Sequence, residues 1–290
     1  MGFLNNWLKS KEVQNQAPVL QLNELTNPNK WDNPEWMAVH RELESYSVDK
    51  HCFSETKEYA YRKGWEWTQC LFGLDQLGAI HANAKGLGVG AGHEPILYYL
   101  TDRIAEVVGT DLYGNAAWSG RSVGGNEADA AVLEDMSQFC PRPFVKEKLK
   151  LINMDGTKLT FADEQFDFVW SLSSIEHFGG HDAATQSMQE MARVTKKGGI
   201  VAVATELILT PNSPSHPEYF TQTEFEKHVV NGAPSLTPIQ AMDYSLPGLE
   251  YLLDPIMLHL EGDVHRVRHH IVLNDSRFQW TSALCFFRKN

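Results

Sequence analysis

The pattern of apolar and polar positions changes character near residue 80. Beyond it, short apolar runs alternate with amphipathic stretches, which is typical of βαβ units that build a parallel sheet. The apolar runs predict strands at 84–89, 106–111, 150–153, 166–170, 200–205 and 278–287. The amphipathic stretches predict helices at 95–104, 127–139 and 184–197. We therefore expect an α/β protein with a doubly wound, mostly parallel sheet.

Two further regions complete the expected organisation. Residues 1–80 contain apolar positions at helical spacing within 65–74 and predict a helical N-terminal extension, followed by a main domain at 81–290. Within that domain, 211–278 carries prolines, aromatics and histidines unlike a buried core, so we expect a lid or cap over a substrate there. The tryptophans of the extension suit core packing or stacking on a sugar or aromatic acceptor, and core packing is favoured for Trp31, Trp36, Trp65 and Trp67.

Composition narrows the possible partners. The 290 residues are 42% hydrophobic, which allows a sizeable core, and the net charge is −12. This charge disfavours nucleic acids and anionic membranes, which attract clustered Lys and Arg, so a small or neutral substrate fits better. The four cysteines form no CxxC pair, and we find neither a signal peptide nor an apolar run near the ~18 residues of a membrane span. We expect a cytoplasmic protein whose oligomeric state stays open.

A glycine-rich segment, KGLGVGAGHEP at 85–95, connects the first predicted strand and helix. Glycine tolerates positive φ and has no Cβ, so such a loop lets a ligand lie against bare backbone. Asp111 ends the second predicted strand, where a carboxylate can accept both ribose hydroxyls of an adenosine. Because 86–91 also satisfies the dinucleotide pattern GxGxxA, these positions alone leave two classes of ligand open.

Three further stretches follow in a characteristic order. Asp155-Gly156 comes after the third predicted strand, SLSSIEHF at 171–178 after the fourth, and KKGG at 196–199 before the fifth. With the glycine loop and Asp111, they resemble the class I S-adenosylmethionine-dependent methyltransferases over about residues 80–210. The resemblance implies a Rossmann-like fold, S-adenosyl-L-methionine as the cofactor and methyl transfer as the activity. It extends to enzymes that tailor glycans and small molecules.

The resemblance also implies that the glycine loop and the strand ends bind the cofactor, through Gly88, Gly90, Gly92, Glu94, Asp111, Leu112, Asp155, Gly156, Ser171 and Leu172. The end of the second strand would bind the ribose, that of the third the adenine, and that of the fourth would line the methyl-donor side. The family usually has an acid where this chain has Gly86, so Glu94 or backbone carbonyls would hold the cofactor's amino group. Glu94 would also repel a dinucleotide's pyrophosphate, whereas an ammonium and a sulfonium tolerate it.

Methyl transfer to oxygen or nitrogen requires alignment and the removal of one proton. His177 follows the fourth predicted strand, at the position where the resembling family places its substrate, and an imidazole titrates near pH ~6.5. We expect His177 to act as the base and Glu176 to orient it or to contact the cofactor. A structural Glu-His pair is the competing interpretation, and His181 and His216 are the alternative bases.

A second group of histidines raises the question of a metal. His265 and His269 are spaced as ligands on one helix face, with His270 beside them. The neighbouring Arg266 and Arg268 would repel a cation, so a substrate-facing insertion or a solvated face is favoured over a metal site.

These observations favour an S-adenosylmethionine-dependent methyltransferase that acts on a hydroxyl of a small molecule or saccharide. The alternatives are an NAD(P)-dependent Rossmann oxidoreductase and an S-adenosylmethionine-binding protein without catalytic activity. The sequence identifies neither the acceptor nor the choice between O- and N-methylation.

Overall fold

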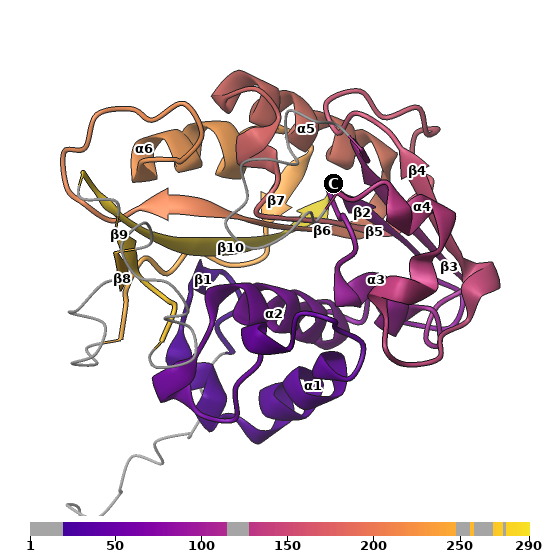
Figure 1. Ribbon diagram of the computed structural model, residues 1–290. Coiled ribbons are helices and arrows are strands. Elements are labelled where there is room, and N and C mark those ends of the chain that lie inside the picture. The colour runs from indigo at the N-terminus through magenta and orange to yellow at the C-terminus, as the bar shows by residue number, and fades with distance from the viewer. Residues whose placement is uncertain (1–19, 115–127, 248–255, 258–268, 275–276) are drawn as a thin grey trace, which may run out of the picture.

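A mixed sheet of ten strands runs through the computed structural model, which describes residues 20–114, 128–247, 256–257, 269–274 and 277–290. The strand order is β4-β3-β2-β5-β6-β10-β9-β8, and β1 and β7 also pair with β10 (Figure 1). Neighbouring strands from β4 to β6 are parallel, and β10 is antiparallel to β6. The expected α/β fold with a mostly parallel, Rossmann-like sheet is confirmed.

The main strands lie close to their predicted positions. They are β2 (Lys85–Val89), β3 (Glu106–Asp111), β4 (Leu149–Asn153), β5 (Phe166–Leu172), β6 (Thr195–Ile208) and β10 (Gln279–Lys289). The order reverses between β2 and β5, because β3 and β4 add on one side of β2 and β5 and β6 on the other. Doubly wound sheets bind ligands at such a reversal, outside the carboxyl ends of the strands. The glycine segment lies at this point.

The long strand β10 pairs with three short strands along its second edge. They are β9 (Leu273–Asn274), β1 (Glu24–Leu25) and β7 (Leu236–Pro238), all antiparallel to β10, and β8 (Ile256–Met257) pairs with β9. Because β1 belongs to the first 80 residues, the expected extension contributes a strand to the central sheet. This pairing joins the extension to the main domain.

Helices cover both faces of the sheet (Figure 1). On one face lie α1 (Pro34–Glu44), α2 (Arg62–Gln76) and α3 (Pro95–Leu100), and on the other lie α5 (His181–Val194), α6 (Gln222–Phe225) and the π-helix η7 (Glu226–Val230). The remaining short helices are η1 (Pro28–Asp32), η2 (Lys50–Cys52), η3 (Lys57–Tyr59), α4 (Ala131–Glu134), η4 (Met136–Phe139), η5 (Lys146–Lys148) and η6 (Ile175–His177). The sheet is thus the middle of three layers.

Three predicted helices differ from the structure, and one of them, expected at 184–197, runs from His181 to Val194, so that Lys196 and Lys197 lie in β6. The helix expected at 95–104 ends at Leu100. In place of the helix expected at 127–139 there is a single turn, α4, followed by η4; residue 127 lies outside the described residues. Asp135 between them is extended at φ −150°, and its side chain accepts a hydrogen bond from the Ser137 N–H. An aspartate that caps a nearby backbone group in this way competes with helix continuation.

The alternation of residues along the strands builds two separate hydrophobic clusters. On the face of α2, even-numbered side chains such as Phe168, Trp170 and Phe286 pack together. On the face of α5, odd-numbered side chains such as Val169 and Val203 pack together. The first cluster also contains four tryptophans of the N-terminal extension, which are buried as favoured from the sequence: Trp31, Trp36, Trp65 and Trp67.

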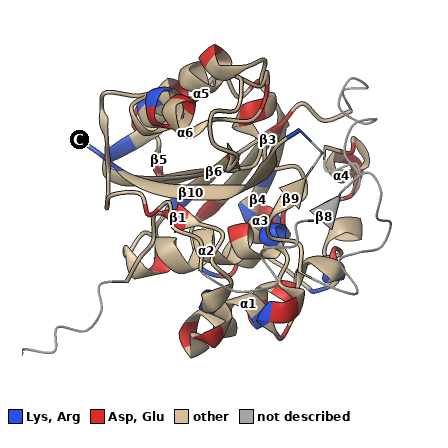
Figure 2. Ribbon diagram, turned by 90° about the vertical axis from the view of Figure 1, so that its left-hand side faces the viewer, with Lys and Arg blue, Asp and Glu red and all other residues tan. Residues whose placement is uncertain are grey.

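Acidic and basic positions are interspersed along the ribbon in Figure 2. On α1, for example, Arg41 is followed by Glu42 and Glu44. Among the described residues, no helix has both the length and the apolar character that crossing a membrane requires.

His40 lies inside the aromatic group of the extension. Its ring stacks on Trp36 with 5.0 Å between centroids, its Nδ1 lies 2.8 Å from the Thr68 hydroxyl, and its Nε2 accepts from the Ser54 N–H. Burial lowers the pKa of His40 from 6.5 to about 4. The fold therefore accommodates the neutral ring and disfavours the charged one.

We expect the protein to lose stability as the pH falls from 7.5 to 5. The unfolded chain binds a proton at His40 near pH 6.5, whereas the folded chain does so only near pH 4. This contribution is complete above pH 6.5, and the two pKa values give a loss of about 2 kcal/mol at pH 5. Urea unfolding at both pH values measures it, and the loss should be smaller by that amount in His40→Gln. Equal pH dependence in both proteins would contradict the buried neutral ring.

Candidate active site

The first two glycines of the segment leave room for aromatic rings of the neighbouring strand. A Cβ on Gly86 would lie 2.7 Å from the ring of Phe168, and a Cβ on Gly88 would lie 2.7 Å from the ring of Trp170. These are the residue pairs that face each other between β2 and β5. Packing within the sheet therefore explains both glycines, and it explains why no acid occupies position 86.

The next two glycines form the turn after β2. Gly90 has φ +66° and Gly92 has φ +45°, a region that favours residues without a Cβ. A Cβ on Gly90 would lie 2.6 Å from the Cβ of Ser174, whose hydroxyl donates to the Gly90 carbonyl at 2.7 Å. The Ala91 N–H donates to the Thr110 carbonyl at 3.0 Å. The turn is thus held between the ends of β5 and β3.

Asp111 at the end of β3 faces this turn. Its Oδ2 accepts from the Gly92 N–H at 2.9 Å, and its Oδ1 accepts from the Leu112 N–H at 2.7 Å. The Tyr113 hydroxyl donates to the Gly92 carbonyl at 2.8 Å from the same strand end. A carboxylate offers about four lone-pair sites, so holding the turn does not exhaust its capacity to bind a diol.

Glu94 is the N-cap residue of α3 and is buried, with 7% of its surface exposed. Its Oε2 accepts from the indole N–H of Trp170 at 3.1 Å. Burial raises the pKa of the Cys70 thiol on α2, and the charge of Glu94 raises it further. The expected role of Glu94 in holding the cofactor's amino group stays a prediction.

The predicted adenine residues follow β4. Asp155 is exposed, and its Oδ1 accepts from the N–H and the hydroxyl of Thr157 at 2.8 and 2.7 Å. Gly156 is buried, and a Cβ there would lie 2.5 Å from the ring of Phe178. The same ring would lie 3.0 Å from a Cβ on Gly90. Phe178 therefore lies between the glycine turn and the end of β4, a position that the sequence pattern does not reveal.

β5 ends in a strained turn. Ser173 has φ +51°, which is rare for a residue with a side chain and is often found at functional sites. Within the described residues, the hydroxyls of Ser171 and Ser173 have no hydrogen-bond partner, although both are buried. The Leu172 carbonyl accepts from Nζ of Lys63, a residue of α2, at 3.2 Å. Buried hydroxyls that lack a protein partner are suited to hydrogen bonding with a bound ligand.

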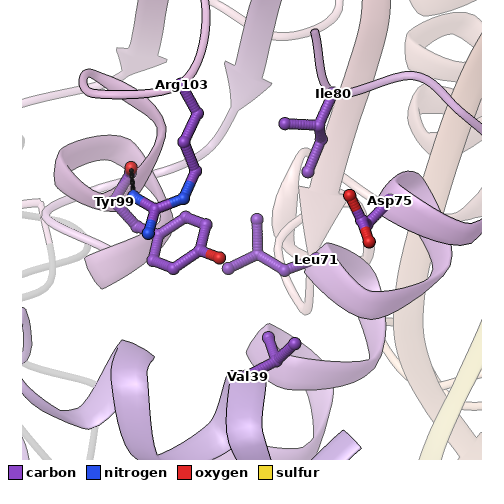
Figure 3. A pocket seen from close by; sticks show the side chains of 6 residues that line it. All are labelled: Val39, Leu71, Asp75, Ile80, Tyr99 and Arg103. Carbon is purple, nitrogen blue, oxygen red and sulfur yellow. Dashed lines mark hydrogen bonds between the residues drawn. The ribbon is translucent and has the colours of Figure 1, made fainter. Parts of the chain in front are cut away.

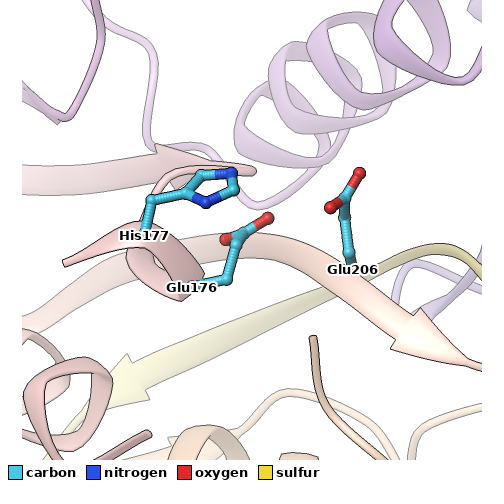
Figure 4. A group of neighbouring side chains, drawn as sticks. All are labelled: Glu176, His177 and Glu206. Carbon is cyan, nitrogen blue, oxygen red and sulfur yellow. The ribbon is translucent and has the colours of Figure 1, made fainter. Parts of the chain in front are cut away.

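Glu176 and His177, on η6, lie beside Glu206 near the end of β6 (Figure 4). One oxygen or nitrogen from each of these three side chains lies within 4.8 Å of the others. Glu176 is fully buried, and its Oε2 accepts from the Thr205 hydroxyl at 2.9 Å. Nδ1 of His177 lies 3.8 Å from Oε1 of Glu218. The predicted pair thus has a third member, and we call the three residues the Glu176–His177–Glu206 group.

Burial and charge shift the protonation of this group. Burial raises the pKa of Glu176 from 4.5 to about 7, although the charge of His177 opposes the rise. Burial would lower the pKa of His177, but its hydrogen bond with Glu218 and the charges of Glu176 and Glu206 outweigh that effect, so the pKa is raised. Shifts of this kind are typical of functional sites.

Two basic residues at the start of α2, Arg62 and Lys63, form ion pairs with buried carboxylates. Arg62 pairs with Glu206 and, at 3.1 Å, with Oε1 of Glu66, while Nζ of Lys63 lies 3.1 Å from Oε2 of Glu66. The hydroxyl of Ser282 on β10 donates to Glu66 and accepts from Arg62. Sequence reasoning missed this network, since α2 is far from β6 along the chain. The available signal was Glu206, the single charged residue in the apolar run 200–209.

The alternative bases make contacts of their own. Nδ1 of His181 lies 3.7 Å from Glu224, and its Nε2 lies 3.1 Å from the carbonyl oxygen of Tyr219. Nδ1 of His216 accepts from the N–H groups of Glu218 and Tyr219. Both histidines therefore take part in holding the segment that follows β6.

The His-rich stretch is only partly described. His269 and His270 are buried, and the ring of His270 stacks on Tyr61 of the extension with 4.0 Å between centroids. His265 lies outside the described residues, so the structure does not bear on the three histidines as a set.

A separate cavity of about 320 Å³ lies among α1, α2 and α3 (Figure 3). The guanidinium of Arg103 lies 3.6 Å from the centre of the Tyr99 ring and donates to the Tyr99 carbonyl at 2.7 Å. None of the residues predicted for the site lines this cavity, whose walls are Val39, Leu71, Asp75, Ile80, Tyr99 and Arg103.

The central part of the chain matches a known family. Residues 87–203 fit the model of a family described as a methyltransferase domain. This span runs from β2 into β6 and includes the glycine turn, Asp111 and the pair Glu176 and His177. The chain contains a class I S-adenosylmethionine-dependent methyltransferase domain. The expected cofactor, S-adenosylmethionine, is thereby confirmed for this domain.

Individual relatives agree with the domain and its fold. The methyltransferase GfsG from Streptomyces halstedii is 30% identical over 122 residues, which cover 41% of this chain and 39% of GfsG. The match therefore spans less than half of the length of this curated relative. A Galdieria sulphuraria protein proposed to be a sarcosine dimethylglycine methyltransferase superposes with a TM-score of 0.52 at 12% identity, over 87% of this chain and 98% of that one. The [4+2]-cyclase SpnF superposes with a TM-score of 0.50 at 12% identity, over 92% and 98%.

The residues at the reversal of the methyltransferase sheet fit S-adenosylmethionine. The turn at Gly90 and Gly92 exposes backbone, Asp111 can bind a diol, and the buried Ser171 hydroxyl lacks a partner within the described residues. The carboxylate of Glu94 is compatible with a cofactor that carries two positive charges. The assignment of each residue to a part of the cofactor stays a prediction.

We expect Gly90→Ala to weaken the binding of S-adenosylhomocysteine at least tenfold, because the new Cβ would displace Ser174 and the end of β5. Gly78→Ala is the matched control: Gly78 also has positive φ, +70°, but a Cβ there meets nothing within 4 Å. Both variants carry the same kind of backbone strain, about 1 kcal/mol, yet only Gly90→Ala should lose affinity. Calorimetric titration measures it, and equal losses in the two variants would refute a specific role of the turn.

Proposed function

We propose that the whole protein transfers the methyl group of S-adenosylmethionine to a hydroxyl of a small molecule or saccharide. The observation that carries the proposal is the carboxylate of Asp111 facing the turn at Gly90 and Gly92, where the strand order reverses. The bound cofactor supplies a carbon that its sulfonium has already activated. The protein's own tasks are to align the acceptor and to remove one proton.

The Glu176–His177–Glu206 group supports an acceptor site at the ends of β5 and β6. The carboxyl ends of parallel strands meet at one edge of the sheet, so this group lies at the same edge as the glycine turn. Ser171 and Leu172, proposed for the methyl-donor side, directly precede it on the chain. We propose that the acceptor's proton is taken up in this group, with His177 as the proton acceptor and Glu176 as its orienting neighbour.

We further propose that the chain consists of an extension at 1–80 and a main domain at 81–290. Within the main domain, residues 211–278 cover the acceptor. Two contacts support this cover: Glu218 approaches His177 at 3.8 Å, and Tyr219 stacks on Trp280 with 5.2 Å between centroids. The parts of the cover at 248–255, 258–268 and 275–276 lie outside the described residues.

The net charge of the chain supports the proposed class of acceptor. A net charge of −12 opposes nucleic acid as the acceptor and is compatible with a neutral or cationic small molecule. The four cysteines carry free thiols, which supports the proposed location in the reducing cytoplasm: Cys52, Cys70, Cys140 and Cys285.

The two alternative functions are not equally well supported. A methyltransferase domain gives no support to the oxidoreductase. A binding protein without methyl transfer is the stronger alternative, because SpnF carries this fold and is named as a cyclase. Product formation therefore has to be measured.

The direct test is a screen of glycans and hydroxyl-bearing small molecules with methyl-labelled S-adenosylmethionine. With an acceptor found, His177→Ala should lower turnover by ~10²–10⁴, the range for loss of a group that handles a proton, and leave S-adenosylhomocysteine affinity nearly unchanged. His216→Ala is the control and should stay within a few-fold of the wild type. If the two variants are equally active, His177 does not act on the acceptor. Cofactor binding without labelled product across the screen would favour the binding protein.

A further inference from the structure

The Glu176–His177–Glu206 group has the donors of a metal site. Two carboxylates and one imidazole each offer one ligand atom, and the three atoms lie within 4.8 Å of one another. Divalent ions hold oxygen and nitrogen ligands at about 2.0–2.2 Å, so two ligands of one ion lie up to about 4.4 Å apart. Side-chain shifts of a few tenths of an ångström would bring the three atoms into that range.

The second, independent indication is the buried charge of Glu176. Its side chain has 0% exposure, and its Oε1 has no hydrogen-bond partner among the described residues, while Oε2 takes the Thr205 hydroxyl. Figure 4 shows the carboxylate between the His177 ring and Glu206, pointing into the group. A buried carboxylate oxygen is strongly unfavourable unless a cation or a proton joins it.

The surrounding charges leave room for a cation. Three buried carboxylates, those of Glu66, Glu176 and Glu206, lie near two basic side chains. In the described part of the chain, Arg62 pairs with Glu66 and Glu206, and Lys63 pairs with Glu66. The contact between Arg62 and Glu206 uses Oε1, which leaves Oε2 of that carboxylate outside the ion pair. Arg62 and Lys63 therefore balance two of the three negative charges, and that of Glu176 is left to the neighbouring His177, when protonated, or to a bound cation.

We propose that Glu176, His177 and Glu206 bind a divalent cation of the Mn²⁺ or Mg²⁺ type, whose remaining coordination positions take oxygen atoms of the acceptor. Two carboxylates with one imidazole suit such an ion, whereas softer metals prefer thiolates. The cation would orient the acceptor oxygen and acidify its hydroxyl, so that the proton would pass to water and His177 would serve as a ligand in place of the direct base proposed above. The role toward the acceptor rests on the proposed function, but cation binding does not.

This site differs from the one weighed in the sequence. There, only histidines were considered as ligands, and a metal was not predicted. The group found here comes from the ends of β5 and β6, and one of its members, Glu206, is not part of any sequence motif.

The test uses the full-length protein after dialysis against EDTA, titrated with MnCl₂ and followed by calorimetry and by the electron paramagnetic resonance of free Mn²⁺. We expect one Mn²⁺ per chain, displaced by excess MgCl₂, and at least 100-fold weaker binding in Glu176→Gln. Glu224→Gln is the matched control, because Glu224 also lies beside a histidine, at 3.7 Å from His181, and glutamine is accepted in its capping box. It should bind Mn²⁺ like the wild type.

Failure to bind Mn²⁺ in the wild type, or equal affinity in Glu176→Gln, would overturn the site and leave His177 in the proposed role of direct base. If Glu176→Gln does not fold by circular dichroism, His177→Ala removes another ligand and must weaken binding for the proposal to stand. S-adenosylhomocysteine is titrated into the same samples. Its binding without Mn²⁺ binding overturns only the cation site, whereas Mn²⁺ binding without S-adenosylhomocysteine binding supports the cation site and contradicts the proposed function.

Discussion

The rings of Phe168 and Trp170 occupy the space that side chains at positions 86 and 88 of β2 would need. This close packing between β2 and β5 determines much of the site. The indole of Trp170 holds the carboxylate of Glu94. Farther along the same stretch, Ser174 donates to Gly90 and fixes the turn that follows β2. A side chain at either of the two strand glycines would therefore disturb the sheet before it could affect any ligand.

The N-terminal region contributes both to the central sheet and to the candidate site. Its strand β1 pairs with β10, and its helix α2 brings Arg62 to the carboxylate of Glu206 on β6 and Lys63 to the backbone carbonyl of Leu172 at the end of β5. Buried charges of this kind are stable only when paired, so the extension and the site depend on each other. The Glu176–His177–Glu206 group, proposed as the acceptor side, thus includes and contacts residues from outside the span 87–203 that matches the methyltransferase domain.

The sequence predicted the features that depend on residues close to one another in the chain. The strands follow from apolar runs, and the position of Asp111 follows from the end of one such run, because both depend on neighbours in the chain. The pairing of Glu176 and His177 with Glu206, and their link to Arg62, depends on contacts between distant segments and has no local signature. The glycine pattern was predicted to serve a ligand, but Gly86 and Gly88 have a packing role that only the facing aromatic rings reveal. The helix expected at 127–139 is interrupted because the Asp135 side chain caps a backbone N–H, which amphipathic spacing does not register.

The central claim is that the reversal of the sheet holds S-adenosylmethionine through Asp111 and the glycine turn. Calorimetric titration of the wild type and Asp111→Ala with S-adenosylhomocysteine and with NADH tests it most directly. The account predicts that the wild type binds S-adenosylhomocysteine and not NADH, and that Asp111→Ala binds it more weakly by roughly 1.5–3 kcal/mol, the range for hydrogen bonds to a charged group. Binding of NADH in preference to S-adenosylhomocysteine, or unchanged affinity in Asp111→Ala, would contradict it.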